Sequence, residues 1–161
     1  MEDKSYYKKL FPLLNKYDLI HNSESELYNC ISHTIGNKES SSWPNEICDY
    51  WPVKKELSIS AFDDFYEYHG FEKVNVLNIL YDKNYIKVAL FTKNNLPTHA
   101  SIQIDNHLWE SKIGSLGIIR HNLFEIEGDI YGGVYAIYRK KLNIDEILSF
   151  KEFFTRKIQI C

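Results

Sequence analysis

The sequence predicts an α+β fold in which helices come first, an antiparallel sheet follows and a helix closes the chain. Apolar residues recur at helical spacing in the first part of the chain, whereas apolar and polar residues alternate in several later segments. A capping-box pattern at Asn143 then marks a new helix. With 161 residues and 19.0 kDa, we expect one domain over 1–161, its core at about 24–140 and the terminal helices packed on that core.

Three helices are expected in the first half. Apolar residues at helical spacing within 4–16 predict an amphipathic helix that packs on the domain. A short helix is expected to begin at Cys30, with Asn29 as its N-cap, and to stop at Gly36. A third helix is expected over 60–69, because its first residue is a serine that begins a capping-box pattern.

The second half is predicted to form an antiparallel sheet, because β-branched and aromatic residues alternate with polar ones between turn residues. The expected strands are 85–91, 98–104, 108–112 and 130–139, and the second and third of these form a hairpin across the short loop 105–107. The closing helix is expected to run from Asn143 through Phe154.

Composition excludes several classes of protein. The net charge of -3 does not suit a nucleic-acid-binding protein, which normally has a basic face. Three cysteines without a CxxC pair argue against a disulfide framework and against a zinc ribbon. The N-terminus is polar and no stretch approaches the ~20 apolar residues of a membrane span, so we expect a cytoplasmic protein, with export by a signal-independent system left open. No Walker loop or dinucleotide glycine pattern is present, and no cofactor is expected.

Cys30 and His99 are the candidate catalytic pair. A thiol at a helix N-terminus meets unpaired backbone N–H groups and the positive end of the helix dipole, which favour the thiolate. His99 stands at the start of a predicted strand, after Pro97. A nucleophile on a helix and a base on a strand, far apart in sequence, is the arrangement of cysteine proteases.

Ser111 is the candidate for a third catalytic position. A short loop at 105–107 places the residue opposite His99 at about 111–114. Cross-strand neighbours lie within about 5 Å of each other, so their side chains can touch. Ser111 then faces the imidazole, and on simple alternation Glu110 points to the other face. A structural hydrogen-bonding role for the serine stays open.

These motifs resemble a family of small bacterial proteins of unassigned function. The resemblance covers roughly 28–139 and rests on the following strings, in this order: Tyr28-Asn29-Cys30-Ile31, Trp43-Pro44, Tyr50-Trp51-Pro52, Lys87 to Phe91, Pro97-Thr98-His99-Ala100, Trp109 to Gly114, and Tyr131-Gly132. That family is distantly similar to the NlpC-type branch of the papain-like hydrolases. The resemblance implies a papain-like α+β fold, with helices packed on a central antiparallel sheet.

The resemblance also implies roles for single residues: Cys30 as nucleophile, His99 as base, and Ser111 at the third position, twelve residues beyond the histidine. Serine departs from the His, Asn or Gln that NlpC-type enzymes usually carry there. The glycine-rich surroundings of their cysteine are absent, so a peptidoglycan substrate does not follow.

Four further residues are candidates for substrate binding, namely Asn29, Trp51, Lys112 and His121. Two Trp-Pro pairs suggest a rigid aromatic loop that either walls the cleft or packs behind it. The alternative for Lys112 is a solvated side chain, and the alternative for His121 is a structural role. A metal site built from Cys30, His99 and His121 is a weaker alternative, because no pair has the short spacing of common zinc ligands.

The leading functional hypothesis is a thiol hydrolase or acyltransferase that acts on an amide or thioester, with a peptide or another amide-containing substrate as its partner. Toxin, effector and defence roles all fit such an enzyme. The alternative is a catalytically inactive binding protein, such as an immunity or adaptor protein, which a weak third residue would favour. The sequence does not specify an oligomeric state.

Overall fold

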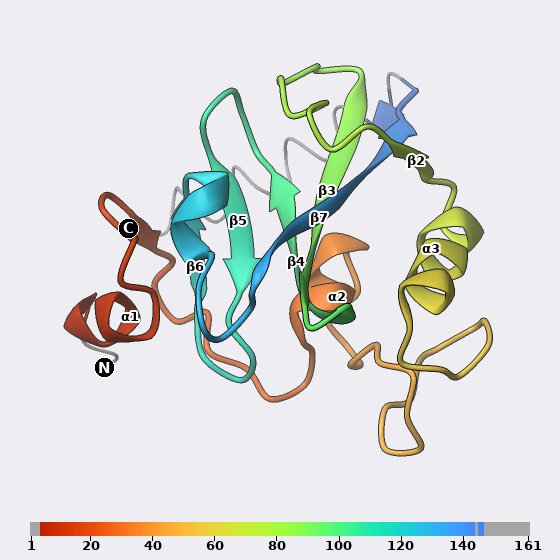
Figure 1. Ribbon diagram of the computed structural model, residues 1–161, viewed down its shortest axis with the longest axis horizontal. Helices are drawn as coiled ribbons and strands as arrows, with labels where there is room; N and C mark the ends of the chain where they lie inside the picture. Colours follow the sequence, from red (N-terminus) through yellow and green to blue (C-terminus); the bar gives the residue numbers. More distant parts are fainter. Residues whose placement is uncertain (1–3, 144, 147–161) are drawn as a thin grey trace.

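The computed structural model describes residues 4–143 and 145–146, and its main feature is a seven-stranded sheet in which every pair of neighbours is antiparallel (Figure 1). The strand order is β1-β6-β5-β4-β3-β7-β2. The strands are β1 (Asp18–Leu19), β2 (Glu72–Val74), β3 (Tyr85–Lys93), β4 (Leu96–Gln103), β5 (Trp109–Lys112), β6 (Ile118–His121) and β7 (Gly133–Lys141). The helices are α1 (Lys4–Leu10), α2 (Cys30–Thr34), α3 (Ile59–Tyr68) and the short 3₁₀ helix η1 (Leu123–Ile126).

Four consecutive strands, β3 to β6, form a meander, and β7 returns to the free edge of β3. The two shortest additions, β1 and β2, extend the sheet at its two edges. In Figure 1, α1 lies near the β6 end of the sheet, α3 lies near the β2 end, and α2 lies against β4.

The predicted papain-like α+β fold is wrong. The described residues are mainly an antiparallel sheet, accompanied by three α-helices of only seven, five and ten residues. Part of the error comes from the first helix, expected over 4–16: Pro12 lacks a backbone N–H and its ring opposes continuation, so α1 ends at Leu10. The rest comes from β1, β2 and β6, which the alternation analysis did not include.

The strands at the centre of the sheet agree with the sequence prediction. β3, β4, β5 and β7 occupy the four expected segments within a few residues, and β4 and β5 form the expected hairpin. Their register pairs Ile102 with Glu110 and Gln103 with Trp109. Because directly paired residues project to the same side of a sheet, this register determines which side chains share a face.

The two faces of the sheet carry separate hydrophobic cores. One core includes Cys30 and Ile31 of α2, the aromatic side of α3, and the sheet residues Val88, Leu90, Ala100, Ile102, Ala136 and Tyr138. The other core joins α1 and the residues after it to the opposite face, through Tyr7, Phe11, Leu14, Ala89, Phe91, Trp109, Ile119 and Ile137. The alternation of these residues along β3 and β7 is the reason that neighbours in sequence enter different cores.

Local capping signals are only partly as expected. Asn29 caps α2 as predicted, because its side chain accepts a hydrogen bond from the Ser32 N–H. The cap of the third helix lies two residues earlier than predicted, at Ser58 and not at Ser60, and the helix begins at Ile59. Asn143 and Glu146 exchange the two hydrogen bonds of a capping box, at 2.9 and 2.8 Å, whereas most of the helix expected through Phe154 lies outside the described residues.

Candidate functional site

Cys30 is the first residue of α2, and its thiol lies against the backbone of β4. Asn29 holds this end of the helix in place, because its side chain also donates to the Ser42 carbonyl and accepts from the Ser42 N–H. The Ala100 N–H, together with the N–H groups of Cys30 and Ile31, donates toward the sulfur. Ala100 lies beyond the two residue pairs that join β4 to β5, so the thiol meets β4 next to the point where its pairing with β5 ends.

The thiol is neutral at physiological pH. Cys30 is only 7% exposed, and burial raises its pKa to about 11, although the three N–H groups and the nearby Lys112 ammonium act in the opposite direction. The helix terminus therefore stabilises the thiolate, but by less than burial destabilises it. A thiolate would have to form during reaction, by loss of its proton to a neighbouring base.

His99 projects from β4 into the opposite core and is completely buried. Its Nε2 atom lies 3.0 Å from the Ser111 Oγ, which confirms the predicted position of Ser111 beside the imidazole. Its Nδ1 atom is buried and has no hydrogen-bond partner among the described residues. Burial, followed by the neighbouring His121 and His33, holds the pKa of His99 well below its usual value, so the ring is neutral.

Thiol and imidazole approach β4 from different sides. Cys30 packs with Ala100 in the core under α2, whereas His99 faces the core that contains Phe91 and α1. The two groups nevertheless lie at neighbouring positions of β4, because the sulfur contacts the N–H of Ala100, the residue that follows His99. Among the described residues no hydrogen bond joins the two side chains.

Ser111 joins His99 to a larger buried network. Its hydroxyl oxygen lies 2.6 Å from the Ser101 Oγ and 2.7 Å from the His121 Nε2. The second nitrogen of His121, Nδ1, lies 2.8 Å from the Asn122 carbonyl oxygen. Burial lowers the pKa of His121 to about 4, so this ring is neutral as well. His121 therefore lies in the interior of the site, and the substrate-binding role considered for it stays a prediction.

Tyr131 covers the imidazole of His99 and was not foreseen. The two rings are parallel, with centroids 4.0 Å apart and an interplanar angle of 8°. The tyrosine is held by its own carbonyl, which accepts from the Thr98 hydroxyl at 2.5 Å. The next residue, Gly132, has a φ of +74°, and a Cβ there would lie 2.0 Å from the Thr92 carbonyl oxygen. The pair Tyr131-Gly132 was thus a usable signal, because only glycine permits this close turn.

Glu110 and Lys112 flank Ser111 on the same strand and point to the other face. Glu110 bonds with both carboxylate oxygens, one to the His33 Nε2 at 2.8 Å and one to the Arg120 Nε at 3.0 Å. Lys112 is buried and donates to the carbonyl oxygens of Ser25, Gly114 and Leu116. The ammonium thus links the segment at Ser25 to the turn between β5 and β6, and substrate binding by Lys112 stays a prediction.

The aromatic loop packs on α3. Trp51 stacks on Phe65 with centroids 4.5 Å apart, lies 4.9 Å from Phe62, and donates its indole N–H to the Lys54 carbonyl. Trp43 meets Phe62 edge-on at 5.3 Å. These contacts place Trp51 in the same core as Cys30, behind the helix, with 7% of its surface exposed.

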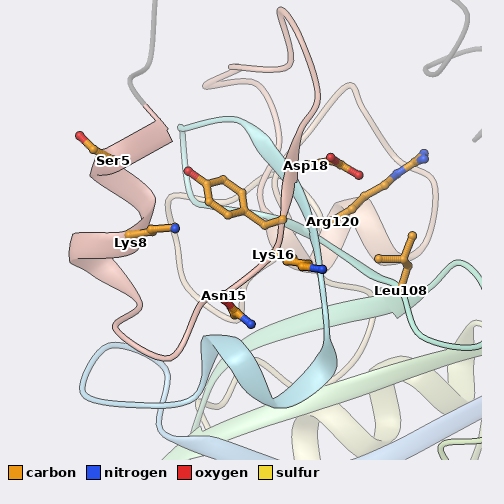
Figure 2. Close-up of a pocket in the computed structure, with 8 residues that line it drawn as sticks. Ser5, Lys8, Asn15, Lys16, Asp18, Leu108 and Arg120 are labelled. Atoms are coloured by element: carbon orange, nitrogen blue, oxygen red, sulfur yellow. The ribbon is translucent and has the colours of Figure 1, made fainter.

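A cavity of about 720 Å³ lies elsewhere, between α1, the edge strand β1 and its neighbour β6 (Figure 2). Its lining is Ser5, Lys8, Asn15, Lys16, Tyr17, Asp18, Leu108 and Arg120, and includes none of the Cys30–His99 network. Within the described ranges no group of three or more His, Cys, Asp or Glu side chains is arranged to hold a metal ion. Among these same residues no helix is long and apolar enough to cross a membrane.

Comparison with known proteins adds a family but no activity. A family model described as a domain of unknown function, DUF7689, matches residues 19–139. No curated protein and no solved structure matches the chain.

Proposed function

Because the chain belongs to the DUF7689 family, whose function is unknown, we propose a function from the site itself: a thiol hydrolase or acyltransferase with Cys30 as nucleophile and His99 as base. One observation carries the proposal. The Cys30 thiol lies at the N–H of Ala100, next to a histidine whose Nδ1 is buried and without a partner. A buried ring nitrogen with a lone pair can act as the base that proton abstraction from a thiol requires.

The proposed reaction begins from a neutral pair. The sulfur attacks the acyl carbon of an amide or thioester while its proton moves to the Nδ1 atom of His99. The bond to the leaving group then breaks, and His99 returns the proton to the departing nitrogen or sulfur. Water or another acceptor attacks the resulting thioester and releases Cys30. The N–H groups of Cys30 and Ala100 stabilise the negative charge that develops at the sulfur as its proton leaves.

The spacing of Cys30, His99 and Ser111 supports the same chemistry, because it is similar to the nucleophile, base and third residue of NlpC-type hydrolases. This similarity is limited to the three residues and their order along the chain. A small activated acyl ester is a suitable probe, since the natural substrate is not specified by the site.

The test measures acylation of the full chain with p-nitrophenyl acetate at pH 7.5, by intact-mass and peptide mass spectrometry. We expect an acetyl group on Cys30, and its rate of formation should fall by about 10²-fold or more in His99→Ala. Cys48→Ala is the matched control and should leave acylation of Cys30 unchanged. Equal acylation rates with and without His99, in variants shown to be folded by circular dichroism, would refute the proposal.

The second candidate is a non-catalytic binding or adaptor protein. Its support is the burial of His99 and its projection into the core opposite Cys30. The acylation experiment separates the two candidates. For a binding protein, Cys30→Ala and His99→Ala change the free energy of unfolding, and no acyl group accumulates selectively on Cys30 in the unmodified chain.

A further inference from the structure

We propose that His121, held by the Asn122 carbonyl, is a positioning residue that determines which nitrogen of His99 carries the proton. The inference rests on the proposed function for its catalytic meaning, although the proton arrangement itself is a property of the folded chain. Its basis is an unbroken line of three hydrogen bonds from Asn122 through His121 and Ser111 to His99, at 2.8, 2.7 and 3.0 Å, of which the first is partly buried and the other two are buried.

The direction of each bond follows from the carbonyl at the end of the line. A carbonyl oxygen only accepts, so the Nδ1 atom of His121 carries the proton. In a neutral ring the other nitrogen, Nε2, is then an acceptor, and the Ser111 hydroxyl donates to it. Burial keeps His121 neutral at physiological pH by lowering its pKa to about 4.

The single proton of Ser111 is thereby committed, so the same oxygen accepts its other two hydrogen bonds. Ser101 donates one of them through its hydroxyl, and the Nε2–H of His99 donates the other. His99 consequently carries its proton on Nε2, and its Nδ1 has a lone pair. The absence of a hydrogen-bond partner for Nδ1 agrees with this result, because a buried N–H group without an acceptor is rarer in proteins than a buried acceptor atom without a donor.

The arrangement suits proton abstraction by His99. When Nδ1 takes the thiol proton, the resulting imidazolium keeps its Nε2–H bond to Ser111, and no group has to rotate. In the opposite arrangement Ser111 would donate to His99 and Nδ1 would already be protonated, which would leave the ring unable to act as base toward Cys30. Tyr131, stacked on the ring, restricts the imidazole to this plane.

The experiment is the tautomeric state of the histidines, read from two-bond ¹H–¹⁵N correlations of ¹⁵N-histidine-labelled full-length protein at pH 7. We expect His99 as the Nε2–H tautomer and His121 as the Nδ1–H tautomer. His121→Gln supplies an amide oxygen in place of the ring acceptor and should preserve the tautomer of His99. His121→Leu and Ser111→Ala remove the acceptor or the linking hydroxyl, and should give a mixture of tautomers and about 10²-fold slower acylation of Cys30.

His107→Gln, a substitution in the exposed hairpin loop, is the control and should change neither readout. A His99 protonated on Nδ1 in the unmodified protein would overturn the inference, as would an unchanged His99 tautomer in folded Ser111→Ala. The tautomer of His99 in the unmodified protein is a sufficient test even where a variant fails to fold. Expected tautomers without acylation of Cys30 would refute the proposed function and leave the proton arrangement standing.

Discussion

Removal of the Cys30 thiol should change the pH dependence of stability at alkaline values. Burial raises the pKa of this thiol to about 11 in the folded protein, against an ordinary value of 9.0 that applies to the unfolded chain. Between these two values the unfolded chain has released a proton that the folded protein retains. The free energy of unfolding therefore falls as the pH rises through this window, and the contribution of Cys30 is constant below it.

The size of the effect follows from the two pKa values. A difference of about two units corresponds to about 3 kcal/mol once the pH exceeds both, at ~1.4 kcal/mol per unit. At pH 10.5 the loss relative to pH 7.5 is about 2 kcal/mol. Cys30→Ala lacks the ionisable group, so it retains the cost of the small cavity it creates but not this alkaline loss.

Urea unfolding followed by circular dichroism at pH 7.5 and pH 10.5 measures the effect. The stability advantage of the unmodified protein over Cys30→Ala should shrink by about 2 kcal/mol between the two conditions. Buried tyrosines also ionise late, but they are present in both proteins and cancel in the difference. Cys48→Ala is the control for loss of a less buried thiol. A difference that is the same at both pH values would show that Cys30 is not held in a buried, neutral state.

Three further substitutions test separate parts of the structure. Trp51→Ala should lower the free energy of unfolding by about 3–5 kcal/mol, because the indole stacks in the α3 core, and a substrate-binding role alone would leave urea unfolding unchanged. Lys112→Met should cost about 3 kcal/mol through the loss of three charge-assisted bonds to carbonyl groups, and a change below about 0.5 kcal/mol would mean that the side chain is solvated. Gly132→Ala should displace Tyr131 from His99, seen as an altered imidazole ring shift in NMR spectra, and an unperturbed spectrum would contradict the close turn at Thr92.

Several predictions from the sequence hold because their causes are local. Asn29 caps α2 through a bond to a residue three positions away, and Asn143 exchanges capping-box bonds with Glu146. The hairpin of β4 and β5 is similarly local, since its loop is short. Its register correctly predicted that Ser111 lies beside His99, twelve residues earlier in the chain. The alternation of residues also placed Glu110 correctly on the face opposite Ser111.

The fold class could not be predicted in the same way. The edge strands β1 and β2 contain two and three residues, which is too short for an alternating pattern to be recognised. β6 is only four residues long and its sequence is two isoleucines followed by Arg120 and His121, so no alternation of apolar and polar residues marks it as a strand. Because these three strands were not predicted, the sheet was underestimated and the share of helix in the fold was overestimated.

By itself, then, the sequence determined the capped start of α2 with Cys30 as its first residue, the central strands, and the pairing of His99 with Ser111, because each depends on neighbours close along the chain. Only the tertiary structure decided what surrounds them. The β5–β6 register brings His121 to Ser111, the turn at Gly132 brings Tyr131 onto His99, and the packing of α2 brings the Cys30 sulfur to the Ala100 N–H. These contacts join distant segments, and the burial that they create raises the pKa of the thiol and lowers that of the imidazole.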